Sequence, residues 1–214
     1  MLLYDYPSAP NPMRLNLFIN EKKITMKKII IDLSKQENIK PKFLKINPWG
    51  TVPFLVVKNQ LICETMAICK YLDYMQPYPK LFGSNPIEVA KIEMYRRKIE
   101  FDGLLAVGEA FRNSASAFKE RVFAGPNKIH AIPELITRGK KRTELFFDFL
   151  DKNLNDSSYV VGNKFSIADI DAYTVLNFAK WIKIKGREKR KNIDRWAKKL
   201  EKRKSFKDYF DLIK

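Results

Sequence analysis

Glu64 and Thr65 lie at a position where a charged side chain and a hydroxyl could bind a small ligand. Residues 60–64 (QLICE) have the pattern of a strand, and residues 65–75 (TMAICKYLDYM) have the pattern of a helix. The first N–H groups of a helix have no partner inside it and attract a carboxylate. Thr65 could also be a plain N-cap residue, and the two roles are compatible.

Pro53 marks a second position of interest, at the start of another predicted strand. The segment NPWGTVPFLVV (47–57) ends in a short apolar run typical of a buried strand, which begins at Pro53. Proline has no N–H to donate but is tolerated at a strand start. From these residues alone, Pro53 either only opens the strand or also shapes a site beside it.

The chain offers little for metal or disulfide chemistry. Cys63 and Cys69 are its only cysteines, and His130 is its only histidine. This inventory argues against a Cys/His metal site and against a disulfide framework. We interpret both thiols as small apolar residues that fill space.

The composition is that of an ordinary globular protein. With 214 residues, of which 45% are hydrophobic and 30% charged, the chain could form one domain or two small ones. The start, MLLYDYPSAP, lacks the basic and apolar regions of a signal peptide. No stretch approaches the roughly 18 apolar residues that a membrane span requires. We therefore expect a cytoplasmic protein without a membrane partner.

The net charge of +17 is unevenly distributed. Residues 1–78 carry 11 basic and 6 acidic side chains, which is +5 and leaves +12 for the rest. Residues 180–207 alone hold 14 Lys and Arg against 3 Asp and Glu. Such a run can bind nucleic acid, but no stacking aromatics are interleaved in it at regular spacing. We favour a solvated, lysine-rich pair of helices and expect no specific nucleic-acid binding.

The elements that must position Pro53, Glu64 and Thr65 form a strand-rich first third of the chain. The pattern predicts strands at 2–5 and 27–33, a helix over MRLNLFINEKK (13–23), a weak helix or loop at 35–46, and a hairpin around Lys58-Asn59. Pro12 suits the first turn of the helix. Together with the helix from Thr65, this order describes a small mixed sheet with helices packed on it.

The rest of the chain is helical in pattern after a Pro/Gly linker, QPYPKLFGSNP. We expect a long helix over about 86–118, another over about 133–154, a third from Ser166 and one or two basic helices at the end. Ser166 and Asp169 form a capping box, with Phe165 and Ile170 as a hydrophobic staple. We expect this motif to stabilise its helix and not to take part in chemistry.

Three stretches, in this order and spacing, resemble the soluble glutathione S-transferase family over essentially the full chain, as a bacterial-like member. They are NPWGTVPFL (47–55), ETMAICKYL (64–72) and VVGNKFSIADIDAY (160–173). The resemblance implies an α/β thioredoxin-like N-terminal domain with a mixed four-stranded sheet (1–76), a linker (77–86) and an all-α C-terminal domain (87–214). It also implies a homodimer with active sites near the subunit interface.

The same resemblance implies a glutathione-binding site. In that family the proline of the Val-Pro pair is cis, and the N–H and C=O of Val52 would pair with the cysteinyl backbone of glutathione like an added strand. Thr65 and the helix N-terminus suit the γ-glutamyl carboxylate, and Glu64 suits the ammonium of the same group. Lys40 and Lys42 are candidates for the glycyl carboxylate, although either could be a plain solvated lysine.

Members of the family activate the thiol with a Tyr, Ser, Cys or Asn donor in or near the loop after the first strand. That loop, YDYPSAPNPMR, offers four donors, which are Tyr4, Tyr6, Ser8 and Asn11. We rank Asn11 above Ser8 because its position three residues before Arg14 resembles the loop of bacterial nu-like members. Arg14 would add a positive charge if it points inward. However, the Thr that such loops place two residues before the Asn is Ala9 here, and the loop has no cysteine for reductase-type chemistry.

We therefore expect a detoxifying enzyme that conjugates the glutathione thiolate to electrophilic, hydrophobic small molecules. Candidates for the wall of the second substrate site lie on the long helix, and they are Glu109, Phe111, Arg112 and Asn113. Glu109 and Arg112 could instead form a surface ion pair at i, i+3. One alternative is a non-catalytic, transferase-like module that binds proteins or RNA polymerase. The loss of Val-Pro or Glu-Thr would favour it, and both pairs are present.

Overall fold

Four short strands form one mixed sheet in the computed structural model, which describes residues 1–214. They are β1 (Leu2–Asp5), β2 (Lys27–Ile30), β3 (Phe54–Val57) and β4 (Gln60–Ile62). Their order is β2-β1-β3-β4, with β1 parallel to β2 and antiparallel to β3. Lys58 and Asn59 turn the chain between β3 and β4 with φ values of 46° and 66°, as in a two-residue hairpin. The predicted sheet is confirmed, although the strand predicted at 27–33 ends at Ile30.

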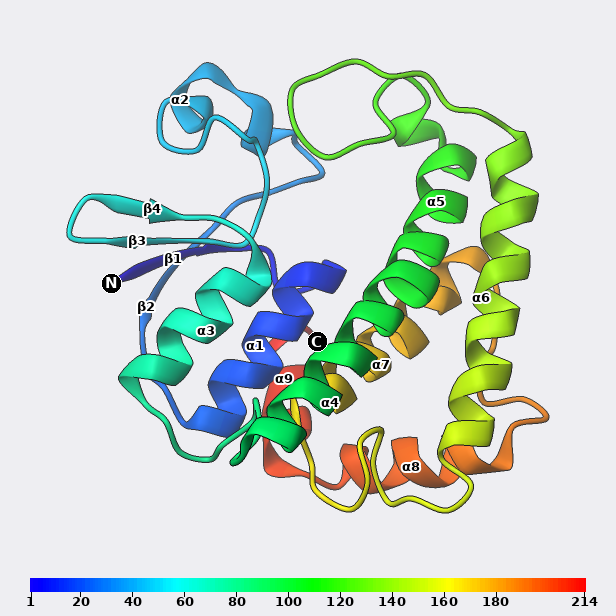
Figure 1. The fold of residues 1–214 in the computed structure, drawn as a ribbon. Coiled ribbons are helices and arrows are strands. Elements are labelled where there is room, and N and C mark those ends of the chain that lie inside the picture. Colours follow the sequence, from blue (N-terminus) through cyan, green and yellow to red (C-terminus); the bar gives the residue numbers. More distant parts are fainter.

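Helices cover both sides of this sheet (Figure 1). The helices α1 (Pro10–Lys22) and α3 (Thr65–Met75) lie side by side, and the one-turn α2 (Pro41–Leu44) lies on the opposite side. Leu15, Phe18 and Ile19 of α1 are buried, as their helical spacing predicts. The segment predicted as a weak helix or loop contains only a 3-10 turn (Glu37–Ile39) and α2.

The start of α1 differs from the sequence prediction. The helix begins at Pro10, whose fixed φ suits the first helical position. Asn11 therefore belongs to the first turn of α1 and not to the preceding loop. Its side chain is exposed at the helix N-terminus, where backbone N–H groups lack partners within the helix.

A long helical rod begins after the linker and crosses the molecule beside the sheet (Figure 1). It consists of α4 (Pro86–Lys98), a π-helical stretch (Ile99–Leu104) and α5 (Leu105–Ser114). The rod ends earlier than predicted, because Ala115 is extended (φ −82°, ψ 125°). The segment that follows, 115–133, contains only a 3-10 turn (Ser116–Phe118) and one isolated bridge between Arg121 and Ile129.

The remaining helices follow the predicted order. They are α6 (Glu134–Asn153), α7 (Ile167–Phe178) with a 3-10 turn (Ala179–Ile182) after it, α8 (Lys191–Glu201) and α9 (Lys204–Leu212). None of the helices combines the length and the apolar character needed to pass through a bilayer. The predicted capping box is present at α7, where the Ser166 N–H donates to Asp169 Oδ2 at 2.9 Å.

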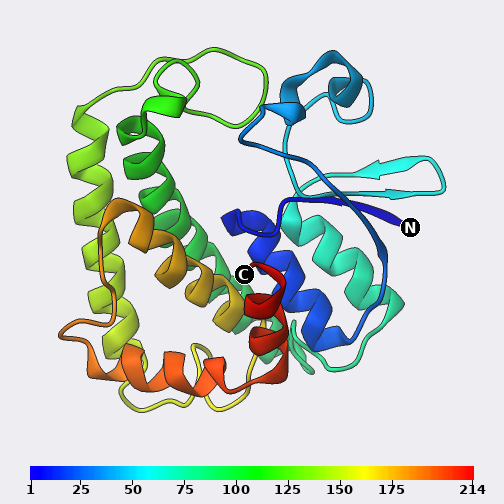
Figure 2. The same ribbon diagram turned by 180° about the vertical axis from the view of Figure 1, so that it is seen from behind.

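A buried ionic cluster joins the sheet part of the molecule to the helical part. Asp171 of α7 accepts from Arg14 Nε of α1 at 2.8 Å and from Arg96 Nε of α4 at 3.0 Å. All three side chains are at most 4% exposed. The last helix, α9, also lies along α1 (Figure 2), and Tyr209 donates its hydroxyl to the Pro7 carbonyl at 2.8 Å. The two parts therefore share one core.

The linker is held by a fully buried lysine at the end of α1. Lys22 Nζ donates to the carbonyls of Gln76 (2.9 Å) and Pro79 (2.6 Å) and also pairs with Asp73. A buried ammonium is costly unless acceptors and a counter-charge surround it, and all three partners here come from the end of α3 and the linker. Lys22 of α1 thus fixes the path of the linker between the two parts.

Candidate active site

The N-termini of α1 and α3 meet at one place, which brings three of the predicted site residues together. Thr65, the first residue of α3, is only 4% exposed and places its hydroxyl 3.5 Å from the Asn11 carbonyl. Glu64 occupies the N-cap position before it and is exposed. Thr65 itself is therefore not the N-cap residue. Two helix N-termini, each with unpaired N–H groups and a positive potential, face this point.

Arg14 lies behind Asn11 and fixes its amide group. Arg14 Nη1 donates to Asn11 Oδ1 at 3.1 Å, while its Nε donates to the buried Asp171. Because a guanidinium can only donate, this contact leaves Asn11 Nδ2, the amide donor, available for a ligand. Burial disfavours the charge of Arg14, but Asp171 outweighs this effect and raises the pKa of Arg14 above its ordinary value. Arg14 thus points inward and remains charged.

The loop before β3 presents an unpaired backbone group. Asn38 donates to the Gly50 carbonyl and Asn47 donates to the Thr51 carbonyl, both at 2.8 Å, so two side-chain amides hold the loop. The Val52–Pro53 peptide bond is cis, as the resemblance implied. The N–H and C=O of Val52 make no hydrogen bond to another residue. An extended peptide could pair with both groups.

The other candidates lie apart from this point or have other partners. Tyr4 lies in β1 with its ring stacked on Phe54 at 4.3 Å between centroids. Tyr6 is half-buried and donates no hydrogen bond, and Ser8 is exposed in the turn before α1. Lys40 is exposed at the start of α2 and forms no ion pair.

Neither cysteine has the surroundings of a reactive thiol. Burial raises the pKa of Cys69, which is fully enclosed, and burial followed by the nearby Glu64 raises the pKa of Cys63. A raised pKa keeps a thiol protonated and unreactive. Any thiolate chemistry at this site must therefore come from the ligand.

Family comparisons match both parts of the chain. Residues 1–74 match the model of the glutathione S-transferase N-terminal domain, and residues 127–204 match the model of the C-terminal domain. Glutathione S-transferase 2 of Saccharomyces cerevisiae is 31% identical over 99% of this chain and 90% of its own length. The chain belongs to the glutathione S-transferase family.

Solved structures agree with this transferase fold. The crystal structure of Gtt2 from Saccharomyces cerevisiae superposes with a TM-score of 0.88, at 30% identity over 98% of this chain and 100% of that one. A Gtt2-class glutathione S-transferase from Vibrio parahaemolyticus gives 0.83, at 30% identity over 98% of this chain and 96% of that one. The protein is thus a glutathione-dependent enzyme of the transferase type, with glutathione as its co-substrate. Its thioredoxin-like sheet part and its all-helical part form the glutathione transferase fold.

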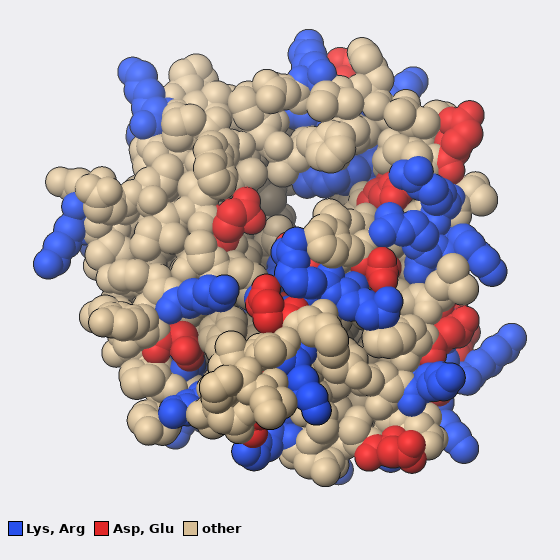
Figure 3. All heavy atoms as spheres, viewed as in Figure 1, with Lys and Arg blue, Asp and Glu red and all other residues tan.

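The transferase is hollowed between the sheet part and the helical rod. Figure 3 shows this opening near the centre of the face, with Lys and Arg side chains around it and inside it. Glu109, a candidate for the wall of the second substrate site, pairs with Arg138 (2.6 Å) and Arg142 (3.0 Å) of α6. Asn113 accepts from the Ile132 N–H at 2.7 Å and so holds the following segment. The other two candidates for this wall, Phe111 and Arg112, make no side-chain hydrogen bond or ion pair.

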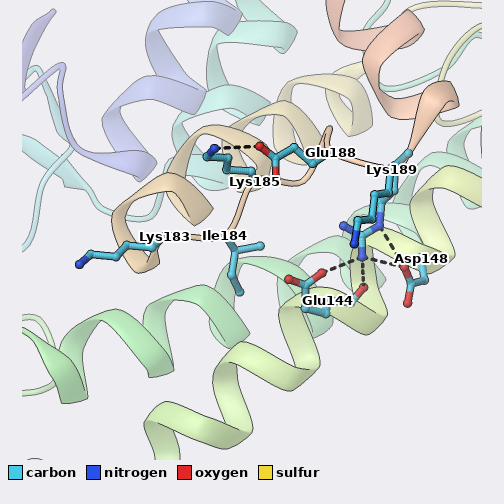
Figure 4. A pocket seen from close by; sticks show the side chains of 8 residues that line it. Glu144, Asp148, Lys183, Ile184, Lys185, Glu188 and Lys189 are labelled. Atoms are coloured by element: carbon cyan, nitrogen blue, oxygen red, sulfur yellow. Dashed lines mark hydrogen bonds and ion pairs between the residues drawn. The ribbon is translucent and has the colours of Figure 1, made fainter.

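A second hollow of about 440 Å³ lies elsewhere, between α6 and residues 183–190. Most of its charged side chains pair with one another, since Arg190 donates to Glu144 and Asp148 at 2.7 Å each, and Lys185 pairs with Glu188 (Figure 4). None of the residues at the two helix N-termini lines it. Ion pairs line most of this cleft, and it lacks an apolar wall for a hydrophobic substrate.

Proposed function

We propose that this transferase ionises the thiol of glutathione through Asn11 and passes the thiolate to an electrophilic, hydrophobic small molecule. The proposal rests on the position and orientation of the Asn11 amide. Arg14 holds its oxygen, so its Nδ2 donor is presented at the N-terminus of α1 beside the N-terminus of α3.

Glutathione would bind as an extended peptide across the start of β3. Its cysteinyl backbone would pair with the N–H and C=O of Val52, next to the cis Pro53. Its γ-glutamyl carboxylate would accept from Thr65 and the first N–H groups of α3, and Glu64 would pair with the ammonium. Lys40 would approach the glycyl carboxylate from the start of α2.

The chemistry requires a thiolate at neutral pH. A free thiol with a pKa near 8.5 is mostly protonated there, and each unit by which the pKa falls corresponds to about 1.4 kcal/mol of preferential binding of the anion. Asn11 Nδ2 would donate to the sulfur, while Arg14 and the N-terminus of α1 add positive potential. The thiolate then attacks the electrophilic carbon, a C–S bond forms, and the leaving group departs with its electron pair.

The test is the ultraviolet absorbance of the bound thiolate as a function of pH. In Asn11→Ala the pKa of bound glutathione should rise by about one unit, because one hydrogen bond to the anion is lost, and conjugation should slow in parallel. Asn155→Ala, in the exposed turn after α6, is the matched control and should change neither. A shift in Ser8→Ala together with an unchanged Asn11→Ala would assign the donor to Ser8 instead.

We also propose that the enzyme is a cytoplasmic homodimer with a role in detoxification. The support for a dimer is a set of exposed apolar side chains on α3, the linker and α4, namely Tyr74, Met75, Tyr78, Ile87 and Met94. Large exposed apolar side chains commonly mark protein interfaces where they gather. Sedimentation of Met94→Glu against the unmodified chain tests this, because a buried carboxylate should convert the dimer to a monomer. The domain boundaries at residues 76 and 87 stay a prediction.

A further inference from the structure

Arg112 of α5 is an arginine without a partner for its charge. It is half-buried, yet its guanidinium donates no hydrogen bond and forms no ion pair in the protein. Its central carbon lies 4.7 Å from the ring centroid of Phe118. Glu109, one turn earlier on the same helix, is committed to two arginines of α6. The i, i+3 ion pair considered from the sequence therefore does not form.

A second arginine faces the same place from the segment that follows α5. Arg121 Nη2 donates to the neutral Oε1 of Gln36 at 3.0 Å, and no carboxylate pairs with it. Burial first, and the charge of Arg121 second, lower the pKa of Arg112. Two neighbouring cations with no anion between them are unfavourable in a protein. No carboxylate of the protein balances the charges of Arg112 and Arg121.

An aromatic cluster adjoins the two arginines. The ring of Phe111 lies 5.3 Å from Phe118, 5.6 Å from Phe178 and 5.0 Å from Trp181, in edge-to-face contacts. Trp181 remains 45% exposed, so the cluster presents an aromatic edge to solvent. Aromatic side chains of this kind bind other rings by stacking and edge contacts.

The two arginines lie where the helical part reaches the glutathione side of the opening. A side-chain carbon on Gly125, in the same segment as Arg121, would come within 2.7 Å of the Trp49 carbonyl. Trp49 is three residues before Val52, and Gln36, the partner of Arg121, lies in the sheet part. The segment thus bridges from α5 to the loop that would hold the cysteinyl backbone, above the opening in Figure 3.

We propose that Arg112 and Arg121 bind the anionic group of an aromatic acceptor, whose ring packs against the Phe111 and Trp181 cluster. This inference rests on the proposed conjugation and names its substrate class as aromatic electrophiles that carry a carboxylate. For an aryl chloride, the glutathione sulfur forms a C–S bond at the carbon that bears chlorine. Chloride leaves with the electron pair of the C–Cl bond, and the thiol proton goes to water.

One other carboxylate could fill the same place, namely the glycyl carboxylate of glutathione. Two acceptors distinguish the sources, 4-chloro-3,5-dinitrobenzoate and its neutral amide, 4-chloro-3,5-dinitrobenzamide. In Arg112→Met, kcat/KM for the benzoate should fall by about 10-fold or more, and that for the amide by no more than about twofold. Ratios between variant and unmodified enzyme cancel the different intrinsic reactivities of the two compounds. Arg112→Lys should recover part of the loss, and Arg121→Met should repeat it.

Arg97→Met is the matched control. Arg97 also lies on the helical rod over a phenyl ring, at 4.3 Å from Phe101, but it is paired with Glu100 at 2.7 Å. It should leave both acceptors unchanged. The melting temperature of Arg112→Met should change little, because the substitution removes a partly buried charge that has no carboxylate partner and keeps an apolar side chain beside Phe118.

Several results would overturn the inference. Equal losses with both acceptors, together with a raised pKa of bound glutathione, would mean that Arg112 acts on the thiolate. A raised KM for glutathione with either acceptor would assign the pair to the glycyl carboxylate. Equal losses with a lowered melting temperature would make its role structural. An unmodified enzyme that conjugates neither acceptor nor any other electrophile would instead count against the proposed function.

Discussion

Glu64 holds an uncommon backbone conformation for a residue with a side chain. Its φ is 66° and its ψ is 122°, and its exposed side chain makes no hydrogen bond. Such a conformation costs free energy in a non-glycine residue and persists where the surroundings impose it, frequently at binding sites. The carboxylate is thus held beside the N-terminus of α3 without serving the fold.

We predict that Glu64→Ala weakens glutathione binding without unfolding the protein. A ligand that binds the folded state raises the melting temperature by mass action, and loss of the charge that pairs with the γ-glutamyl ammonium should reduce this shift. Glu134→Ala, at the exposed start of α6, is the control and should keep the full shift. Equal shifts in both variants would remove Glu64 from the binding site.

For single residues, the sequence predicted the features that depend on neighbouring positions in the chain. The strand after Pro53 and the helix from Thr65 follow from local order, and both elements begin where the pattern predicts them. The glutathione-binding roles of Val52, Glu64 and Thr65 stay predictions. The partner of Arg14 could not be predicted, because Asp171 lies 157 residues away. The lack of an ion pair at Arg112 could not be predicted either, because it arises when Glu109 pairs with arginines of another helix.

Among the elements, the start of α7 carries more interactions than a helix cap alone. Asp169 accepts from the N–H groups of Ser166 and Val160 and from Trp196 Nε1, each at 2.9 Å. It therefore joins α7 to the preceding loop and to α8. The sequence predicted the capping box, but the two distant donors depend on the tertiary fold.

We predict that Asp169→Ala destabilises the protein by about 3–5 kcal/mol, because three buried donors lose their acceptor. Ser166→Ala removes only the cap side chain and should cost about 1 kcal/mol. Chemical denaturation measures both, and turnover per folded molecule should stay nearly constant. A large loss of specific activity in a normally stable Asp169→Ala protein would contradict the structural role.

The same carboxyl group should make stability depend on pH. Burial raises the pKa of Asp169 to about 6, despite the hydrogen bonds that oppose the shift. The folded protein then holds this proton more tightly than the unfolded chain, so its contribution is full below about pH 4 and is lost as the pH rises to about 6. The stability difference between the unmodified protein and Asp169→Asn should fall over this range. A difference that rises with pH would show that the three donors lower the pKa instead.

Sequence patterns did not predict the first residue of α1 or the last residue of the helical rod. Apolar spacing located α1 and suggested Pro12 for its first turn, but the helix begins two residues earlier, at Pro10. The rod was expected to run to residue 118, and it stops at Ser114, where Asn113 binds the chain beyond it. That early end creates the segment that carries Arg121.

For the whole molecule, the positive charge is partly compensated by contacts between distant elements. Arg187 pairs with Glu201, Arg190 with two carboxylates of α6, and Arg203 with Glu21 of α1. These arginines belong to the basic run that suggested nucleic-acid binding. Because these arginines are paired, the groups left to bind phosphates are mainly exposed lysines, which do so without specificity.

We predict weak binding to a labelled DNA duplex that falls linearly with the logarithm of the salt concentration and is lost near about 0.15 M salt. Fluorescence anisotropy across a salt series measures it. The double variant Lys202→Glu/Lys207→Glu should reduce the slope, while Lys35→Glu/Lys45→Glu, on the sheet part, should change it less. Tight binding that persists at about 0.15 M salt would instead support a nucleic-acid-binding function.

The buried cluster of Arg14, Arg96 and Asp171 has a consequence for inheritance. Arg14 belongs to the segment that matches one family model, and Asp171 belongs to the segment that matches the other. A gene that joined residues 1–74 of this transferase to the helical part of a relative without an aspartate at position 171 would leave Arg14 buried without its counter-charge. A buried charge left alone costs about 3–5 kcal/mol, a large share of the 5–15 kcal/mol that keeps a protein folded. Positions 14 and 171 should therefore change together among relatives, and recombination between the halves should succeed only where both parents carry the pair.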